Sequence, residues 1–154
     1  MKRQKFTKGA IVKIPIGDGY HTYGRLMLDP YIEVIDARTK DDIALQSILE
    51  KPILFTVCFF YRQAISNGTW EIIEKVPFDE TKIRTSKQFR QDDFDIQKCK
   101  LVDMWGDEQE CSLEECRGHE RLAVWSPQNI VRRILDHYEG RPNATLQDLS
   151  LKER

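Results

Sequence analysis

The sequence lacks the features that define membrane proteins, secreted proteins and the common nucleotide-binding or hydrolytic enzymes. Its longest apolar stretch, residues 53–61, is about half the length that crosses a bilayer. Its basic start, residues 1–5, is not followed by the apolar core of a signal peptide. It contains no P-loop, Gly-x-Ser-x-Gly elbow, His-Glu-x-x-His motif or Gly-x-Gly-x-x-Gly fingerprint. We therefore expect a soluble, cytoplasmic protein with no membrane contact.

Neither sign of charge dominates, because 24 Lys and Arg residues face 25 Asp and Glu residues for a formal net charge of -1. Such a balance offers no basic surface to nucleic acid, so no nucleic-acid partner is expected. Hydrophobic residues make up 40% and charged residues 32% of the chain, which is typical of a folded domain. We expect one domain over residues 1–143, followed by a polar tail, 144–154.

The four cysteines do not have the spacing of a zinc site. Cys58 lies in an apolar run and is expected to be a small buried hydrophobe. Cys99, Cys111 and Cys116 are scattered, and neither a second close pair nor a histidine cluster accompanies them. A disulfide is not expected in a cytoplasmic chain of this size. The sequence therefore predicts plain thiols, no metal and no cofactor.

The strongest structural signal is a β-hairpin in residues 10–28. Two arms rich in β-branched, aliphatic and aromatic residues flank Gly17-Asp18-Gly19, where positive φ angles are easily adopted. Pro15 has no amide donor, so the first arm should be an edge strand or contain a bulge. Gly24 inside the second arm predicts a bend or a close backbone approach. We expect a strongly curved hairpin against which the later strands pack.

Further strands are expected at 31–35, 53–61, 70–76, 99–104 and 121–125. The continuous apolar run 53–61 should be central and covered on both faces, with 70–76 as its partner. Between these strands, 36–40 is polar and turn-like, and 78–97 is predicted to be a long loop. Its apolar residues should hold this loop against the core: Phe78, Ile83, Phe89, Phe94 and Ile96.

Two helices complete an α+β pattern. The first should start near Asp41 or Asp42 as N-cap and end at Glu50. The second should span 127–139, with Ser126 as N-cap, Pro127 as first residue and Gly140 after its end. Ser112 and Glu115 have the spacing of a weak capping box, and Arg132 and Asp136 that of an exposed pair. We predict a mostly antiparallel, strongly bent sheet or an SH3-like partial barrel, with a short internal helix and a C-terminal helix.

A series of short motifs follows the hairpin signal in a fixed order. They are Gly-Ala-Ile-Val-Lys-Ile-Pro-Ile-Gly-Asp-Gly-Tyr at 9–20, Tyr-Gly-Arg at 23–25, Lys-Pro-Ile-Leu-Phe at 51–55, Gly-Thr-Trp-Glu-Ile-Ile at 68–73, Phe-Arg-Gln-Asp at 89–92, Glu-Arg-Leu-Ala-Val-Trp at 120–125 and Asp-His-Tyr at 136–138. In these motifs the chain resembles the bacterial immunity protein 26 family over roughly residues 5–143. The family motif of the 120s carries a leucine before the glutamate, where this chain has His119. The resemblance implies an immunity protein of a polymorphic toxin system, which binds and neutralises a partner toxin without catalysis.

An uneven distribution of acids favours one region as the toxin-binding surface. Residues 103–115 hold six Asp and Glu residues and no Lys or Arg, and three more aspartates lie in 92–95. We interpret them as an electronegative face that steers toward a basic toxin, with Trp105 as an aromatic anchor. The candidate toxin-binding residues are Asp92, Asp93, Asp103, Trp105, Asp107, Glu108 and Glu110. The alternative is a solvated loop with Trp105 in the core, where Trp70 and Trp125 are expected in any case.

Two other functions stay open at this point. A hydrolase or nuclease could use His119 and Glu120 as an acid/base pair, although Glu120 could equally pair with Arg121 where a loop enters a strand. No other motif accompanies His119, His21 or His137. A small barrel could instead bind a peptide or single-stranded nucleic acid through Tyr20 and Tyr23.

Overall fold

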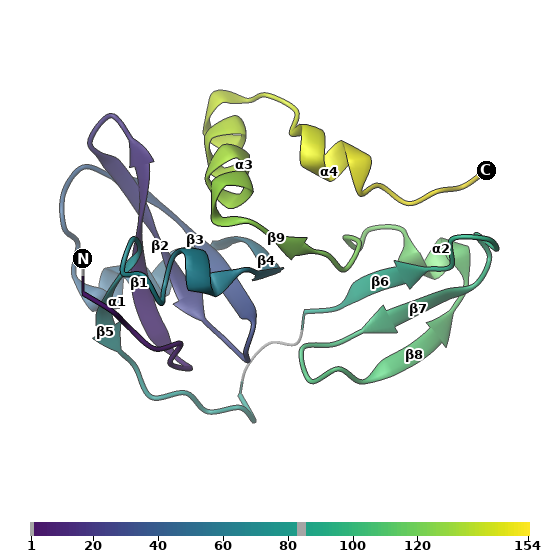
Figure 1. Ribbon diagram of the computed structural model, residues 1–154, viewed down its shortest axis with the longest axis horizontal. Helices are drawn as coiled ribbons and strands as arrows, with labels where there is room; N and C mark the ends of the chain where they lie inside the picture. Colours follow the sequence, from purple (N-terminus) through teal and green to yellow (C-terminus); the bar gives the residue numbers. More distant parts are fainter. Residues whose placement is uncertain (1, 83–85) are drawn as a thin grey trace.

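The computed structural model describes residues 2–82 and 86–154. Its strands form two separate sheets (Figure 1). The large sheet has the strand order β5-β1-β2-β3-β4-β9 and the small sheet the order β6-β7-β8. Neighbouring strands are antiparallel, except β4 and β9, which are parallel. The predicted α+β class is confirmed, but over the described residues neither sheet closes into a barrel.

The longest strands lie in the first half of the chain and the longest helix lies in the second. The large sheet consists of β1 (Ala10–Gly17), β2 (Tyr20–Leu26), β3 (Tyr31–Thr39), β4 (Ile53–Phe59), β5 (Glu71–Lys75) and β9 (Val124–Trp125). The small sheet consists of β6 (Gln88–Gln91), β7 (Cys99–Val102) and β8 (Glu108–Cys111). The helices are α1 (Leu45–Glu50), α2 (Leu113–Cys116), α3 (Pro127–Glu139) and α4 (Ala144–Asp148), with a single 3-10 turn, η1 (Tyr61–Gln63). We call residues 86–123, which hold the small sheet and α2, the small lobe. Among the described residues, no helix has the length and hydropathy to span a bilayer.

The first hairpin has the predicted form. Gly17, Asp18 and Gly19 all have positive φ angles, of 96°, 55° and 78°. The register of β1 against β2 shifts between Pro15 and Gly17, so the proline lies at a bulge, while β1 itself pairs on both sides. A Cβ on Gly24 would lie 2.7 Å from Cδ1 of Ile32, so side chains approach this glycine closely rather than another backbone segment.

Both faces of the large sheet are covered by a helix. Ile130 and Ile134 of α3 join one apolar cluster with Val12 and Ile14 of β1. On the other face, the buried Ile48 of α1 belongs to a second cluster. The helix α3 has the predicted bounds, because the Ser126 hydroxyl accepts from the amide of Asn129 and Gly140 ends the helix in the left-handed conformation.

Several predictions for the middle of the chain are wrong. The strand β3 continues to Thr39, because the Thr22 hydroxyl donates to the carbonyl of Ile35 and accepts from the amide of Ala37. The helix α1 begins only at Leu45, after a residue that provides no side-chain cap. The strand β4 is an inner strand, as expected, between β3 and the short edge strand β9, but β5 pairs with β1 instead of β4.

The second half of the chain differs more from prediction. The strands β6 and β8 were missed, and Phe94, expected against the core, is fully exposed. Ile83 lies outside the described residues. The expected surface pair of Arg132 with Asp136 is not formed; Asp136 is buried and binds Arg141 and Asn143. The polar tail contains α4, after which the backbone of Lys152 exchanges two hydrogen bonds with the side-chain amide of Gln91 on β6.

Candidate functional site

All candidate residues lie on the small lobe, but they are distributed over three parts of it. These parts are the turn from β6 to β7, the end of β7 with its turn to β8, and β8 itself, which carry Asp92 and Asp93, then Asp103, Trp105 and Asp107, and then Glu108 and Glu110. Because β7 joins the two turns, they lie at opposite ends of the small sheet, about 13 Å apart for a strand of this length. The lobe as a whole holds ten Asp and Glu residues and six Lys and Arg residues.

Two of the carboxylates stabilise the turns in which they lie. The Oδ1 of Asp92 accepts the backbone N–H groups of Phe94 and Asp95, both at 2.8 Å. These hydrogen bonds hold the pKa of Asp92 below its usual value. The Oδ1 of Asp103 accepts the N–H groups of Trp105 at 2.9 Å and Asp107 at 3.0 Å. Asp92 and Asp103 therefore shape the two turns and leave less of their hydrogen-bonding capacity for a partner.

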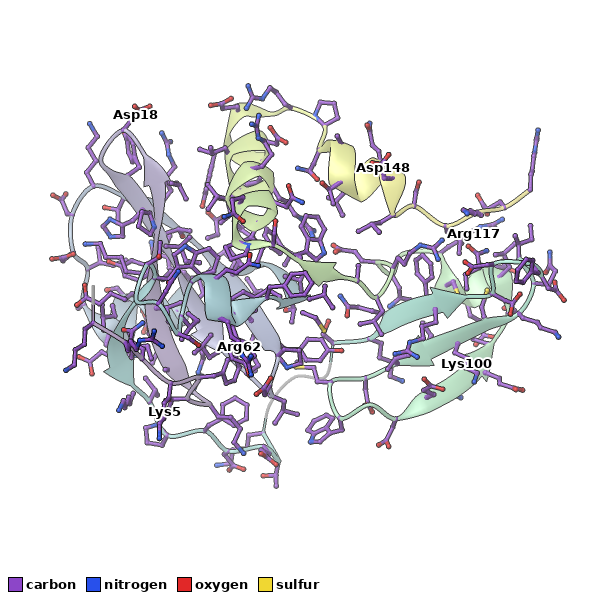
Figure 2. All side chains as sticks on the ribbon, in the orientation of Figure 1. Lys5, Asp18, Arg62, Lys100, Arg117 and Asp148 are labelled. Atoms are coloured by element: carbon purple, nitrogen blue, oxygen red, sulfur yellow. The ribbon has the colours of Figure 1, made fainter. Side chains whose placement is uncertain are left out.

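Glu108 is balanced by cations from the other two strands of the small sheet. Its Oε1 lies 3.3 Å from Nη1 of Arg90 and its Oε2 lies 3.3 Å from Nζ of Lys100. Figure 2 shows Lys100 on the small sheet, well away from Lys5 and Arg62 of the large-sheet side. The stretch 103–115 lacks basic residues only along the sequence; the strand register places Lys100 opposite Glu110 and Arg90 opposite Lys100. Sequence reasoning missed these cations because β6 and β8 were not recognised.

Three candidate acids are exposed and take part in no ion pair among the described residues. Asp93, Asp107 and Glu110 are exposed, and no ion pair within residues 2–82 and 86–154 involves any of them. They lie in the first turn, in the second turn and on the outer strand β8, respectively. Their charges are therefore the ones that a partner would meet first.

An exposed aromatic side chain accompanies the acids at each end of the small sheet. Trp105 is 45% exposed in the second turn, as an interface anchor would be, whereas Trp70 and Trp125 are each only 3% exposed, as predicted. Phe94 is 100% exposed in the first turn and was not among the candidates. The sequence did carry a signal for it, since Asp92, Asp93 and Asp95 around the phenylalanine favour a solvent-exposed turn.

A comparison with known protein families identifies the chain. The sequence model of Immunity protein 26 matches residues 7–100, which is more than half of the chain. The chain belongs to the Immunity protein 26 family. Neither the curated proteins nor the solved structures contain a match.

The match covers only part of the candidate site of this Immunity protein 26 member. Residues 7–100 contain β1 to β6 and the first two residues of β7, and so include Asp92 and Asp93. The turn with Trp105 and Asp107, and the strand β8, lie after the matched residues. Most of the candidate surface is therefore outside the part of the chain that carries the family match.

The pair once considered for catalysis, His119 and Glu120, is held by structural contacts. Arg133 of α3 binds both carboxylate oxygens of Glu120, at 2.9 Å and 2.5 Å. The Arg133 guanidinium lies 3.8 Å from the ring centre of Phe55, and the Nδ1 of His119 lies 3.3 Å from a backbone carbonyl oxygen. Both oxygens of Glu120 are thus engaged, which removes the argument for it as a general base.

The surroundings of this pair add a cavity but no metal-binding group. Glu33 lines a cavity of about 360 Å³ beside His119 and Glu120, and burial raises the pKa of Glu33. Within the described part of the chain, no cluster of His, Cys, Asp or Glu residues could hold a metal ion. The other histidines contact different neighbours, Tyr23 for His21 and Tyr138 for His137.

The two tyrosines of the first hairpin do not form a stacking surface. Tyr23 is 1% exposed and its hydroxyl lies 2.8 Å from Nε2 of His21. The ring of Tyr20 is covered by the Arg38 guanidinium at 4.0 Å and the Lys40 ammonium at 4.8 Å. The Tyr23 ring is therefore buried, and the partly exposed Tyr20 ring is already in contact with two cations.

Proposed function

We propose that the chain is an immunity protein that binds a cognate toxin through the small lobe and neutralises it by stoichiometric, non-catalytic occlusion. One observation carries the proposal: in a member of an immunity family with a formal net charge of -1, residues 86–123 alone hold four more acids than bases. A local excess of this kind accelerates encounter with a basic partner and orients it.

Within the lobe, the proposal divides the candidate residues by what each is able to do. Asp93, Asp107 and Glu110 attract the toxin, since their charges are exposed and form no ion pair among the described residues. Trp105 supplies the apolar contact that slows dissociation, and the fully exposed Phe94 supplies a second one at the other turn. Asp92 and Asp103 hold the turns in place, and Glu108 balances its cations.

The outer strand β8 gives the proposed surface a second mode of contact. Among the described strands, only β7 pairs with β8, so one edge of β8 presents its backbone groups outward. A toxin segment could add to this edge as a further strand, with Glu110 beside it. Such a preformed surface would cover the toxin's active site or its substrate-binding face without any chemical step.

The experiment uses the product of a toxin gene adjacent to the gene of this chain. We expect co-expression to yield an equimolar complex in which the toxin is inactive. The double variant Asp93→Lys/Asp107→Lys should then associate about tenfold more slowly, because two reversals remove the acid excess of the lobe. Association of the unchanged chain should slow as salt is added, and association of the variant should respond less.

A matched control separates local from global charge. Glu71→Lys/Glu74→Lys makes the same change of charge on β5, the edge strand of the large sheet opposite β9. This variant should keep the association rate within about twofold of that of the unchanged chain. Equal slowing by both double variants would show that only net charge counts. An unchanged rate in the lobe variant would show that its acids are merely solvated, and the absence of any complex would refute the proposed function itself.

A further inference from the structure

Three of the four cysteines lie together in the small lobe, although they are scattered in the sequence. Cys99 of β7 and Cys111 of β8 are directly opposite each other in the strand register. Cys116 ends α2, and its Sγ lies 3.3 Å from the Sγ of Cys111. All three belong to one apolar cluster with Phe89. Cys58, by contrast, lies in a different cluster, away from the other thiols.

The two closest thiols differ in their access to solvent. Cys111 is partly exposed, whereas Cys116 is completely buried. Burial, together with hydrogen bonds to the thiols of Cys111 and Cys99, raises the pKa of Cys116. An oxidant in solution therefore reaches Cys111 first, and Cys116 is positioned to react only with a modified Cys111.

The chain between the two cysteines is held in a fixed conformation. The hydroxyl of Ser112 accepts from the amide of Glu115 at 3.1 Å, and a carboxylate oxygen of Glu115 accepts from the amide of Ser112 at 3.0 Å. This reciprocal capping fixes the single turn of α2 between Cys111 and Cys116. A disulfide has an S–S length of about 2.05 Å, so the sulfurs need to approach by little more than about 1 Å.

We propose that Cys111 and Cys116 are an oxidative modification site that a hydroperoxide converts to a disulfide. The Cys111 thiol releases its proton, the thiolate attacks a peroxide oxygen and the O–O bond breaks. The hydroxide that leaves takes up the released proton, so hydrogen peroxide yields a sulfenic acid and one water molecule. The sulfur of Cys116 then attacks the Sγ of Cys111, the S–O bond breaks, and the hydroxide leaves as water with the proton of Cys116. In total, two thiols lose two electrons and two protons to one peroxide.

This site stands independently of toxin binding, and its consequence is local. The disulfide would tie the end of β8 to the end of α2, beside the proposed toxin-binding strand. Cys99 has no direct part in the bond and remains a thiol.

The digestion pattern of the chain makes a direct test possible. Trypsin cleaves after Lys98, Lys100 and Arg117, so residues 101–117 form one peptide that contains both Cys111 and Cys116, while Cys99 falls in a separate dipeptide. The full chain is treated with hydrogen peroxide, alkylated and digested. We expect peptide 101–117 to lack both alkyl groups and two hydrogen atoms, and to regain the reduced mass after dithiothreitol. Oxidation of Met104 or Trp105 adds oxygen instead and resists dithiothreitol.

Three variants test the assignment. Cys111→Ser, at a partly exposed position where folding is preserved, should abolish the disulfide. Cys58→Ala, which removes a buried thiol from another cluster, should leave its yield unchanged. Ser112→Ala, which removes half of the capping box, should slow disulfide formation without preventing it.

Three outcomes would overturn the proposal. The first is a product that joins the Cys99 dipeptide to peptide 101–117. The second is a sulfinic or sulfonic acid at Cys111 as the main product. The third is unreacted Cys111 and Cys116 under conditions that oxidise an equimolar amount of glutathione completely.

Discussion

The large sheet and the small sheet are stabilised in different ways. The strands of the large sheet carry long runs of buried aliphatic residues, and its main cluster joins the strands to α3. The small sheet has strands of four residues, and its cluster contains only Phe89, Cys99 and Cys116 as fully buried members. The large sheet is stabilised by an extensive apolar core. The small sheet has a small core and depends in addition on turns, ion pairs and the C-terminal segment.

This difference indicates that the large sheet is a support and that the small sheet carries the exposed candidate surface. A sheet covered by helices on both faces is a rigid support. Short strands joined by polar turns can present exposed side chains without loss of core packing. In Figure 1 the small sheet projects from the large one, with β9 and α4 lying beside the junction. The candidate site lies on the part with the smaller core.

The largest expected effect compares the same truncation in both cores. Phe59 stacks on Trp70 with ring centres 5.8 Å apart, and Phe89 lies under the Arg121 guanidinium; both phenylalanines are 1% exposed. Phe59→Ala should lower the free energy of unfolding by about 4 kcal/mol, and Phe89→Ala by about 2 kcal/mol, because the partly exposed neighbours of Phe89 can close around the cavity. Urea denaturation followed by tryptophan fluorescence measures both values.

The same experiment shows whether the two sheets unfold as one unit. Hydrogen exchange in Phe89→Ala should increase in β6, β7 and β8 and stay slow in β1, β2 and β3. A uniform increase throughout the chain would mean that the small lobe is an integral part of a single cooperative core.

The two sheets also differ in how far the sequence predicts them. The apolar alternation of β1 and β2, the glycines of their turn and the caps of α3 are local signals, and they were interpreted correctly. The partner of β5 was predicted wrongly. Gln4 fixes the start of β5 through hydrogen bonds to Trp70 and Ile72, and these bonds join residues that are far apart in the sequence. In the small lobe, the four-residue strands β6 and β8 have too few apolar residues to show a period.

The sequence showed where the acids gather but not which of them form ion pairs. The acidic stretch 92–115 lies wholly within the small lobe, and its part in toxin binding stays a prediction. What sequence reasoning could not provide is the register, which sets Arg90 and Lys100 beside Glu108 and gathers Cys99, Cys111 and Cys116. Both results depend on pairing between strands that were not recognised.

A second prediction concerns the link between the two sheets. Arg133 of α3 reaches Glu120 at the edge of the small lobe while its guanidinium lies over Phe55. Arg133→Met keeps an apolar stem of similar length but removes both bonds to Glu120, so we expect a loss of about 2 kcal/mol, reduced from a fully buried pair because Glu120 is partly exposed. Arg132→Met, on the exposed neighbour, should change stability by less than about 0.5 kcal/mol.

Chemical denaturation of these two variants gives the decisive values. If Arg133→Met and Arg132→Met lose the same stability, the contact with Glu120 contributes nothing. If Arg133→Met loses more, but Glu120→Gln loses nothing, the effect comes from packing on Phe55 alone.

A smaller effect compares helix caps in the two regions. Ser126 caps the thirteen-residue helix α3, and Ser112 caps the single turn of α2. Ser126→Ala should cost about 1 kcal/mol of global stability, because the whole helix packs on the large sheet. Ser112→Ala should cost less than about 0.5 kcal/mol in denaturation and should instead speed hydrogen exchange at the amide of Glu115. Equal costs in denaturation would contradict the assignment of a weaker core to the small lobe.

The smallest expected effect is a pH dependence that arises in the large sheet alone. His21 is buried, and burial, followed by the nearby charge of Lys13, lowers the pKa of its imidazole below the usual 6.5. The unfolded chain therefore binds a proton at His21 at a higher pH than the folded chain does. The stability that neutral His21 contributes is fully present above about pH 6.5. It is lost as the pH falls toward the lowered pKa of His21 in the folded chain. Comparing the urea midpoints of the unchanged chain and His21→Gln between about pH 7.5 and about pH 5.5 isolates this contribution, because all other groups titrate in both. The midpoint of the unchanged chain should fall more steeply on acidification, while hydrogen exchange in β6, β7 and β8 should show no difference in slope between the two proteins. A steeper response in the small sheet would mean that the protonation of His21 is felt across the junction.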